Sequence, residues 1–248
     1  MKILHSIFLV FFVNFLAFGC AKSSGIEGKV VNAKGQPMAD VKIIAKQVQP
    51  IKGYESFETT TGSDGIFRFK GLYPTSEYTL FPHAEYWSTD YLKTTVKSGP
   101  EGQISMLTSE IVIRFTAPKD GIINDSKTGL QWAQDCGGTG PKVISWYQAN
   151  AYVNNLRLGG YNDWRLPSKE ELEEIVSYAK SQGIKGELGE LFNKIGFKNV
   201  HFDYYWSSTT CAPYPGYAWV VSMWYGYVNY GYKSGYGSYY VWPVRGGQ

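Results

Sequence analysis

Helical periodicity is confined to one short part of this 248-residue chain. Between Ile144 and Leu158, apolar side chains recur at helical spacing. A second such run follows Pro167, where Ser168 and Glu171 have the spacing of a capping box. Elsewhere, short β-branched and aromatic runs alternate with turns rich in Gly, Asn and Pro. Since 44% of the residues are apolar and 18% are charged, the chain can bury a core. The sequence therefore predicts a mostly β protein with helices only in its second half.

The N-terminal residues have the composition of an export signal. Lys2 supplies a positive charge, and a mostly apolar run over residues 3–18 follows it before Gly19 and Cys20. The run is shorter than the roughly 20 residues that a membrane-spanning helix needs. This ending resembles the signal peptide of bacterial lipoproteins. The resemblance implies that residues 1–19 are removed and that Cys20 receives the lipid.

Export also determines what the cysteines predict. With Cys20 as a lipid anchor and residues 20–25 as a short tether, Ala21 favours, by the same resemblance, sorting to the outer membrane and display at the cell surface. The alternative is an ordinary secretory signal that leaves an unmodified Cys20 in the mature chain. Because an exported protein meets an oxidising compartment, we expect a disulfide between Cys136 and Cys211, with two separate thiols as the alternative.

The first half of the mature chain, residues 26–118, is predicted to be all-β, with a hairpin turn at residues 62–65 and a last strand at Ile111–Phe115. The order of its motifs resembles the carboxypeptidase regulatory-like domain: Gly28-x-Val30, Gly35-x-Pro37, Val41, Thr61-x-x-Asp64-Gly65-x-Phe67 and Tyr78-Thr79-Leu80. The resemblance implies a β-sandwich of the immunoglobulin or transthyretin type. It implies no catalysis, so we expect this domain to act as a spacer.

The second half, residues 119–248, carries motifs built largely on aromatic residues. They are Thr128-Gly129-Leu130-x-Trp132, Trp146-x-x-Ala149, Gly160-Tyr161-x-Asp163-Trp164-Arg165-Leu166-Pro167-Ser168-x-x-Glu171-Leu172, Tyr205-Trp206-Ser207-Ser208-Thr209, Ala218-Trp219-x-Val221 and Val244-Arg245. This set resembles the Lcl C-terminal domain family. The resemblance implies an α+β fold of the C-type-lectin type, with two helices against a small, twisted antiparallel sheet.

The motif residues also have a structural interpretation. Large apolar side chains are expected in the core, which places Trp132, Trp164, Leu166 and Trp206 there. Arg165 lies between two of them, and we expect it to pair with a carboxylate such as Asp163 or Glu171. A role for Arg165 in contacting a ligand is the alternative.

The sequence offers little for catalysis, metal binding or nucleic-acid binding. Formylglycine-generating enzymes share the C-type-lectin plan and depend on cysteines, but no matching motif surrounds Cys136 or Cys211. His201 is the only histidine in this half. Asn162-Asp163 has no second acidic loop to complete a calcium site. A net charge of +3 without a basic block gives no electrostatic footprint for nucleic acid. We therefore expect a protein that is not an enzyme and needs no cofactor or metal.

Aromatic residues are concentrated at the C-terminus. Residues 201–248 hold 11 of the 20 tyrosines and 4 of the 8 tryptophans but only three charged residues. Within residues 224–240 nearly every residue is Tyr, Gly, Ser or Asn, the composition of antibody-type binding surfaces. Trp219, Val221 and Met223 alternate just before and are expected to face inward. The opposite side and its loop are predicted to bind a ligand through Trp224, Tyr225, Tyr227, Asn229, Tyr230, Tyr232, Ser234, Tyr236, Ser238 and Tyr239. The alternative is an aromatic core rich in strands.

These features favour a surface-displayed lipoprotein that binds an unknown protein or glycan through its C-terminal residues. Codons for Tyr, Asn, Ser and Gly are related by changes of adenine. The C-terminal residues resemble the variable region of target proteins of diversity-generating retroelements, some of which are surface lipoproteins. The alternative is an adhesin-type lipoprotein that binds carbohydrate, such as a glycosaminoglycan, without diversification. A sulfated glycan demands a basic patch, whereas residues 201–248 contain only Lys233 and Arg245 as cations.

Overall fold

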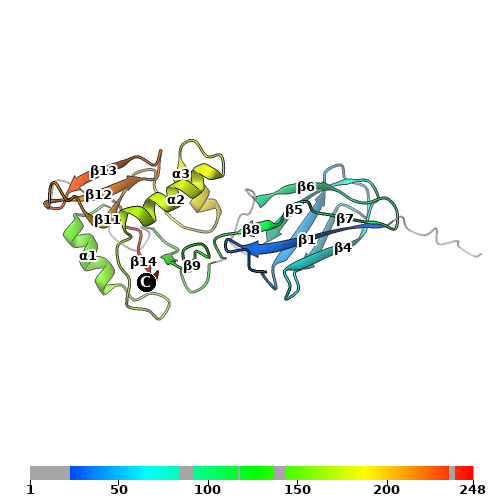
Figure 1. The fold of residues 1–248 in the computed structure, drawn as a ribbon, viewed down its shortest axis with the longest axis horizontal. Helices are drawn as coiled ribbons and strands as arrows, with labels where there is room; N and C mark the ends of the chain where they lie inside the picture. Colours follow the sequence, from blue (N-terminus) through cyan, green and yellow to red (C-terminus); the bar gives the residue numbers. More distant parts are fainter. Residues whose placement is uncertain (1–22, 84–91, 117, 137–142, 235–237, 248) are drawn as a thin grey trace, which may run out of the picture.

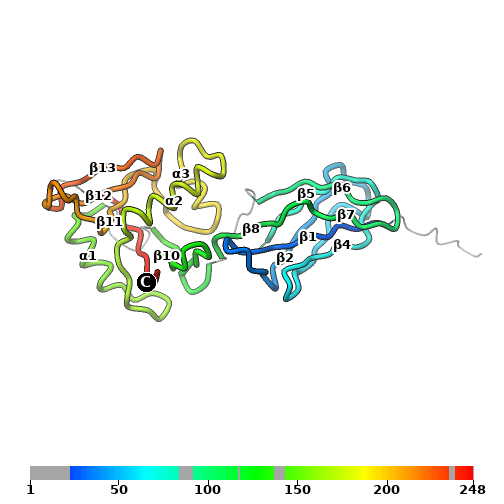
Figure 2. The backbone as a smooth tube through the Cα atoms, viewed as in Figure 1, coloured from blue at the N-terminus to red at the C-terminus, as the bar shows by residue number. Residues whose placement is uncertain are grey.

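The computed structural model describes residues 23–83, 92–116, 118–136, 143–234 and 238–247. It is mostly β-sheet with three short helices, and all three lie in the second half of the chain, which confirms the distribution predicted from periodicity. Figure 1 shows two groups of elements arranged along one long axis: the strands of residues 24–113 and the elements of residues 122–245. In the tube view of Figure 2, the chain passes once from the first group to the second.

The first group consists of two sheets. Its eight strands are β1 (Ser24–Asn32), β2 (Lys42–Gln47), β3 (Ser56–Thr60), β4 (Ile66–Leu72), β5 (Glu77–His83), β6 (Thr94–Lys97), β7 (Ile104–Met106) and β8 (Ile111–Ile113). One sheet has the order β4-β1-β7, with β8 also pairing with β1, and the other has the order β3-β2-β5-β6. Buried side chains of both sheets, such as Ile26 and Phe67 from one and Ile43 and Leu80 from the other, belong to one cluster. The two sheets therefore pack face to face.

The turn at residues 62–65 does not form the hairpin that the sequence predicts. β3 pairs with β2 and β4 pairs with β1, so this turn carries the chain from one sheet to the other. Gly65 has a φ of +75°, and a Cβ there would lie 2.5 Å from the carbonyl oxygen of Val30. A glycine is needed because this turn packs directly against β1, whose Val30 N–H donates to the Gly65 carbonyl at 2.9 Å.

The last strand of the first group is shorter than predicted. β8 ends at Ile113, and the two residues that follow pack against the second half of the chain. The Phe115 ring lies 5.3 Å from that of Tyr178 and 5.6 Å from that of Phe197. Phe115 is fully buried among these rings. The strand predicted for Ile111–Phe115 therefore ends two residues early, and Phe115 packs in the core of the second group.

The second group contains three helices and two small sheets. Its elements are β9 (Ile122–Asn124), β10 (Gln131–Ala133), α1 (Trp146–Asn155), α2 (Lys169–Ser181), α3 (Leu188–Lys194), β11 (Tyr204–Thr210), β12 (Tyr217–Ser222), β13 (Val228–Tyr232) and β14 (Val244–Arg245). The sheets have the orders β14-β10-β9 and β11-β12-β13. α1 is shorter than the helical pattern over residues 144–158, because Ser145 caps its N-terminus and Leu156 already has an extended backbone.

The start of α2 shows how local sequence fixes local structure. Ser168 and Glu171 form the predicted capping box, with the Ser168 hydroxyl accepting the Glu171 N–H at 3.1 Å and the Glu171 carboxylate accepting the Ser168 N–H at 2.7 Å. The same carboxylate accepts two hydrogen bonds from Arg165, at 2.7 and 2.8 Å. Of the two predicted partners of Arg165, the structure therefore selects Glu171. Asp163 instead binds Arg245, whose hydrogen bonds lower the pKa of the Asp163 carboxyl.

Three of the motif tryptophans, Trp132, Trp164 and Trp206, are buried, whereas Trp146 and Trp219 are half-buried. Trp132, Trp164, Leu166 and Trp206 are each at most 3% exposed, as expected for core residues. The Trp206 indole N–H donates to the Ile144 carbonyl at 2.7 Å, and that of Trp164 to the Leu158 carbonyl at 3.3 Å. Each of these two side chains thus combines apolar packing with a hydrogen bond that fixes its orientation.

The predicted disulfide between Cys136 and Cys211 is not formed. Both residues are buried free thiols. They lie in different parts of the domain: the Cys136 N–H donates to the Lys198 carbonyl, beside the bridge between Asp135 and Lys198, and the Cys211 N–H donates to the Tyr217 carbonyl. Burial raises the pKa of the Cys136 thiol well above its ordinary value. Burial thus protects each thiol separately.

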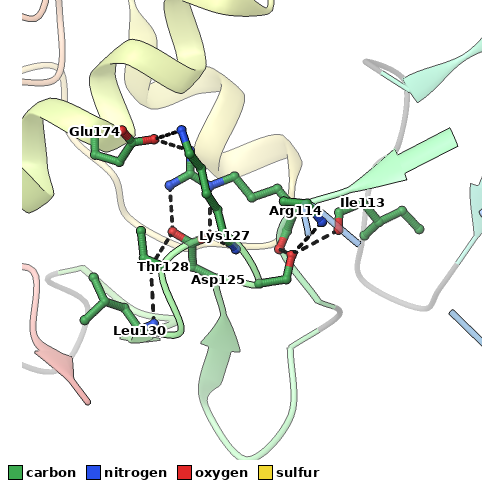
Figure 3. Close-up of polar contacts among 9 residues, drawn as sticks. Ile113, Arg114, Asp125, Lys127, Thr128, Leu130 and Glu174 are labelled. Atoms are coloured by element: carbon green, nitrogen blue, oxygen red, sulfur yellow. Dashed lines mark hydrogen bonds and ion pairs between the residues drawn. The ribbon is translucent and has the colours of Figure 1, made fainter. Parts of the chain in front are cut away.

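A buried ion pair joins the end of the first group to the second (Figure 3). Arg114, which follows β8, is 3% exposed and donates two hydrogen bonds to the carboxylate of Asp125, at 2.6 and 2.9 Å. It also lies 3.1 Å from the carboxylate of Glu174 on α2, which Lys127 contacts at 2.6 Å. The Arg114 guanidinium therefore connects β8, the turn after β9 and the half-buried Glu174 of α2.

Candidate ligand-binding surface

The β12–β13 hairpin places aromatic side chains side by side. Its register pairs Tyr217 with Tyr232 and Trp219 with Tyr230, so these four residues lie on one face. Their rings pack edge to face: the centroids are 5.1 Å apart for Tyr217 and Tyr232, and 6.0 Å apart for Trp219 and Tyr230. Tyr214, in the turn before β12, adds a ring 5.9 Å from that of Tyr230. We call these five residues the hairpin aromatic group.

A second set of rings occupies the turn between β12 and β13. Trp224 and Tyr225 are stacked with centroids 5.4 Å apart and planes 10° apart, and Tyr227 lies 5.7 Å from Tyr225. We call these three residues the turn aromatic group. Gly226 has a φ of +72°, and a Cβ there would lie 2.3 Å from a methyl carbon of Val176 on α2. Glycine at this position therefore allows the turn to close against the helix.

Both groups are accessible to a ligand. Tyr227 is 64% exposed and Tyr214 is 54% exposed, and the remaining exposed members are Trp224, Tyr225, Tyr230 and Tyr232. Their backbone is held in place, because the Gly189 N–H donates to the Met223 carbonyl and the Leu188 N–H donates to the Trp224 carbonyl. Six large aromatic side chains are thus presented on an ordered framework.

The surface is nearly uncharged. The sequence has no charged residue or histidine between Asp203 and Lys233. Lys233 is buried, with its Nζ 2.8 Å from the Thr210 hydroxyl and 4.4 Å from the centre of the Trp146 ring. Two cations of α2 lie beside the aromatic groups: Lys169 is 5.2 Å from the centre of the Trp219 ring, and the Lys180 Nζ would lie 3.0 Å from a Cβ at Gly226. Recognition here therefore relies on rings, hydroxyls and backbone groups.

The remaining predicted contact residues are distributed differently. Ser234 and Ser238 are exposed, and Asn229 is exposed on the face opposite to Tyr230, whose N–H donates to its side-chain oxygen at 2.8 Å. Tyr239 is only half-exposed, because its ring packs edge-on against Trp206 at 4.8 Å, so it lies at the edge of the core. Tyr236 lies outside the described residues.

Trp219 lies on the same strand face as Val221, as alternation predicted, but Tyr230 and Tyr232 share this face instead of occupying the opposite one. Val221 and Met223 are fully buried as predicted, but Trp219 is half-buried beside Tyr230 at the surface. Sequence reasoning also missed Tyr214 and Tyr217. Pairing β12 with β13 across Gly226 reveals Tyr217 and Trp219, because the register places them opposite tyrosines already predicted to be exposed. Tyr214 precedes β12 and is found only from its ring contact with Tyr230.

A cleft of about 590 Å³ beside the Arg114 junction is a weaker candidate. Charged residues that line it already form ion pairs with each other, since Arg114 and Lys127 both contact Glu174. Among the described residues, no group of three or more His, Cys, Asp or Glu side chains could hold a metal ion. In the same part of the chain, no helix is long and apolar enough to cross a membrane.

The second group of elements coincides with the part of the chain that a family model matches. The Lcl C-terminal domain family matches residues 121–245, half of the chain. The protein belongs to this family. No curated protein matches the chain.

Several solved structures have weak similarity. A DUF3823 family protein from Parabacteroides merdae is 17% identical, with a TM-score of 0.29 over 45% of this chain and 58% of that one. The major pilin subunit of Bacillus cereus is 15% identical, with a TM-score of 0.28 over 36% of this chain and 29% of the pilin. A putative carbohydrate-binding protein from Pseudomonas aeruginosa is 14% identical, with a TM-score of 0.25 over 38% of this chain and 90% of that one. TM-scores this low assign no function.

Proposed function

We propose that this protein is a lipid-anchored surface protein that binds a macromolecular ligand through the hairpin and turn aromatic groups. The observation that carries the proposal is the exposure of six large aromatic side chains along a segment without charge. Monomeric proteins seldom expose such patches unless they bind something. Tyr and Trp are favoured at binding sites because they bury a large area with few rotatable bonds.

The finer parts of the proposal concern fold, display and diversity. The domain of residues 119–248 would be C-type-lectin-like, the first domain a spacer, and Cys20 the lipid anchor at the outer membrane. The proposed role is binding, without catalysis or a cofactor. Retroelement diversification is proposed from the Tyr, Ser, Gly and Asn composition within residues 224–240. A sulfated glycan is disfavoured as ligand because the aromatic surface carries no basic cluster.

Truncating one exposed ring should separate binding from stability. Tyr227→Ala should change the free energy of unfolding by no more than about 0.5 kcal/mol, since its side chain is largely in solvent. The probes are peptides selected from a displayed linear-peptide library, or hits on a neutral glycan array. The binding free energy of a probe that contacts the Tyr227 ring should become weaker by about 2 kcal/mol. Thermal unfolding and titration of the same purified variant measure both quantities.

Tyr147→Ala provides the matched control. Tyr147 is 58% exposed, but it lies on α1 and belongs to neither aromatic group. This variant should bind every selected probe as the unaltered protein does. If Tyr147→Ala and Tyr227→Ala weaken binding equally, or if neither does, the proposed surface is wrong.

Lipid anchoring is tested at the acceptor cysteine. Cys20→Ser should move the protein from the membrane fraction into the soluble exported fraction, because a lipid on Cys20 is the proposed membrane attachment. Ser23→Ala, three residues further on, should leave the protein in the membrane. Fractionation with mass spectrometry of the N-terminus measures the outcome. Retention of Cys20→Ser in membranes with an intact N-terminus would instead make residues 3–18 the anchor.

A further inference from the structure

Among the described residues, β13 has one edge without a partner strand. In the sheet order β11-β12-β13 it lies at the end and pairs only with β12. The Ser222 N–H donates to the Tyr227 carbonyl, and the Lys233 N–H donates to the Gly216 carbonyl, both at 2.9 Å. These two bonds set the phase of the antiparallel ladder, in which every second residue turns its backbone groups towards the partner strand. Val228, Tyr230 and Tyr232 therefore direct their N–H and C=O groups away from β12.

These outward backbone groups have no backbone partner within the described part of the chain. The N–H of Tyr230 donates to the side-chain oxygen of Asn229, an exposed acceptor that can be replaced. Carbonyl and amide groups alternate along the edge at the spacing of a strand. Such a row is complemented along its length by another extended backbone.

The edge also lacks the residues that usually prevent pairing with another chain. Edge strands are commonly protected by charged side chains or proline. Two other edge strands follow this rule: β3 contains Glu58, and β4 contains Arg68 and Lys70. β11, at the other end of the same sheet as β13, also lacks a charge and a proline, but its outer edge is covered by backbone hydrogen bonds to Tyr240 and Pro167. β13 contains neither a charge nor a proline, although four of its five residues are exposed.

We propose that β13 accepts an extended, uncharged segment of a partner protein as an additional strand, flanked by the hairpin and turn aromatic groups. This inference rests on the proposed function and specifies its partner. The backbone of the segment would pair with Val228, Tyr230 and Tyr232. Its alternating side chains would lie against the Tyr230 and Tyr232 rings on one face and beside Asn229 on the other. An uncharged segment fits because a charge buried there would meet no counter-ion on the hairpin.

The test removes one outward N–H group of β13 and leaves every aromatic side chain in place. Val228→Pro removes one edge donor while leaving the bonds to β12, because this N–H points away from that strand. Val228→Ala is the matched control, since it shortens the side chain and keeps the donor. The probe is a displayed library of linear peptides selected on the full mature protein. Selected peptides should bind Val228→Ala within about threefold of the unaltered protein and bind Val228→Pro at least about tenfold more weakly.

Amide hydrogen exchange gives a second readout that does not depend on the folding of a variant. In the free protein, the outward amides of Val228 and Tyr232 should exchange faster than those of Asn229 and Gly231. A bound peptide should slow the Val228 and Tyr232 amides. Methylation of alternate amide nitrogens in the peptide should weaken binding at every second position, as strand pairing requires.

Failure of this inference is distinguishable from failure of the proposed function. Equal binding to Val228→Pro and Val228→Ala, with binding still lost in Tyr227→Ala, would overturn strand addition and keep the aromatic surface. If the library yields no binder but a neutral oligosaccharide binds through the same rings, strand addition is likewise overturned and the aromatic surface is kept. Loss in none of the three variants would overturn both.

Discussion

Trp206→Ala should lower the free energy of unfolding by about 3–5 kcal/mol. The Trp206 side chain is fully buried between α1 and the β11-β12-β13 sheet, in a cluster with Ala149, Val153 and Val220. Its truncation leaves a cavity and removes the hydrogen bond to the Ile144 carbonyl. The loss approaches the whole stability of an ordinary domain, so the variant should unfold largely or completely near 37 °C.

Trp224→Ala is the matched control for this prediction. It is the same substitution in the same sheet region, but Trp224 is 45% exposed and stacks only on Tyr225. Its cost should stay below about 1 kcal/mol. Chemical denaturation of both variants measures the contrast. If Trp224→Ala melts as early as Trp206→Ala, the turn aromatic group is part of the core, and the ligand-binding proposal loses its basis.

Local features of the sequence were sufficient to predict α1, α2 and the burial of Trp132, Trp164 and Trp206, whereas α3, which has no side-chain cap, was not predicted. The start of α2 is encoded by residues within four positions of each other, Ser168 and Glu171 among them. Trp132, Trp164 and Trp206 have large apolar side chains, for which burial in the core is favourable. Such predictions succeed because their physical cause lies within one turn of helix or within one side chain.

Long-range pairings were beyond local reasoning. The turn at residues 62–65 has hairpin composition, yet the strands on its two sides join different sheets, because both find better partners elsewhere. An oxidising compartment favours disulfides, but it does not bring Cys136 and Cys211 together. Proximity between segments is decided by the whole fold.

The aromatic surface has one property that follows from composition and another that depends on long-range strand pairing. Composition alone indicated that many tyrosines of residues 201–248 would be exposed, since buried hydroxyls need partners. Which face each one occupies depends on the hairpin register, which Gly226 and its contact with α2 help to fix. Tyr230 and Tyr232 therefore share the face of Trp219 instead of the opposite one, and Tyr239 lies at the edge of the core.

Arg114 is the clearest case of a residue whose role depends on distant partners. The sequence shows a single cation within the apolar run Ile111–Phe115, where a strand face exposed to solvent is the simplest interpretation. Its partners Asp125 and Glu174 lie 11 and 60 residues further along the chain. The guanidinium also packs 4.9 Å from the centre of the Tyr178 ring. These contacts make it a buried connector between the two groups of elements.

Arg114→Ala should destabilise the protein by about 3–5 kcal/mol, because it leaves the Asp125 carboxylate buried without its cation. Asp125 is itself fully enclosed and has only the Thr128 hydroxyl and the Lys127 N–H as further donors. The double variant Arg114→Met with Asp125→Asn should cost clearly less than the sum of the two single changes. Each single change leaves one charge of the pair without its partner, whereas the double variant removes both charges. A double-mutant cycle by urea denaturation measures this coupling.

Arg68→Ala is the matched control, because the Arg68–Glu27 ion pair lies on the surface and the Arg68 side chain is 52% exposed. Its loss should cost no more than about 1 kcal/mol, since water screens the pair. The expected difference between the two arginine variants thus follows from burial alone. Equal costs, or full additivity in the Arg114 cycle, would show that the junction is held by the packing of Phe115 against Tyr178 and Phe197, with the ion pair contributing little.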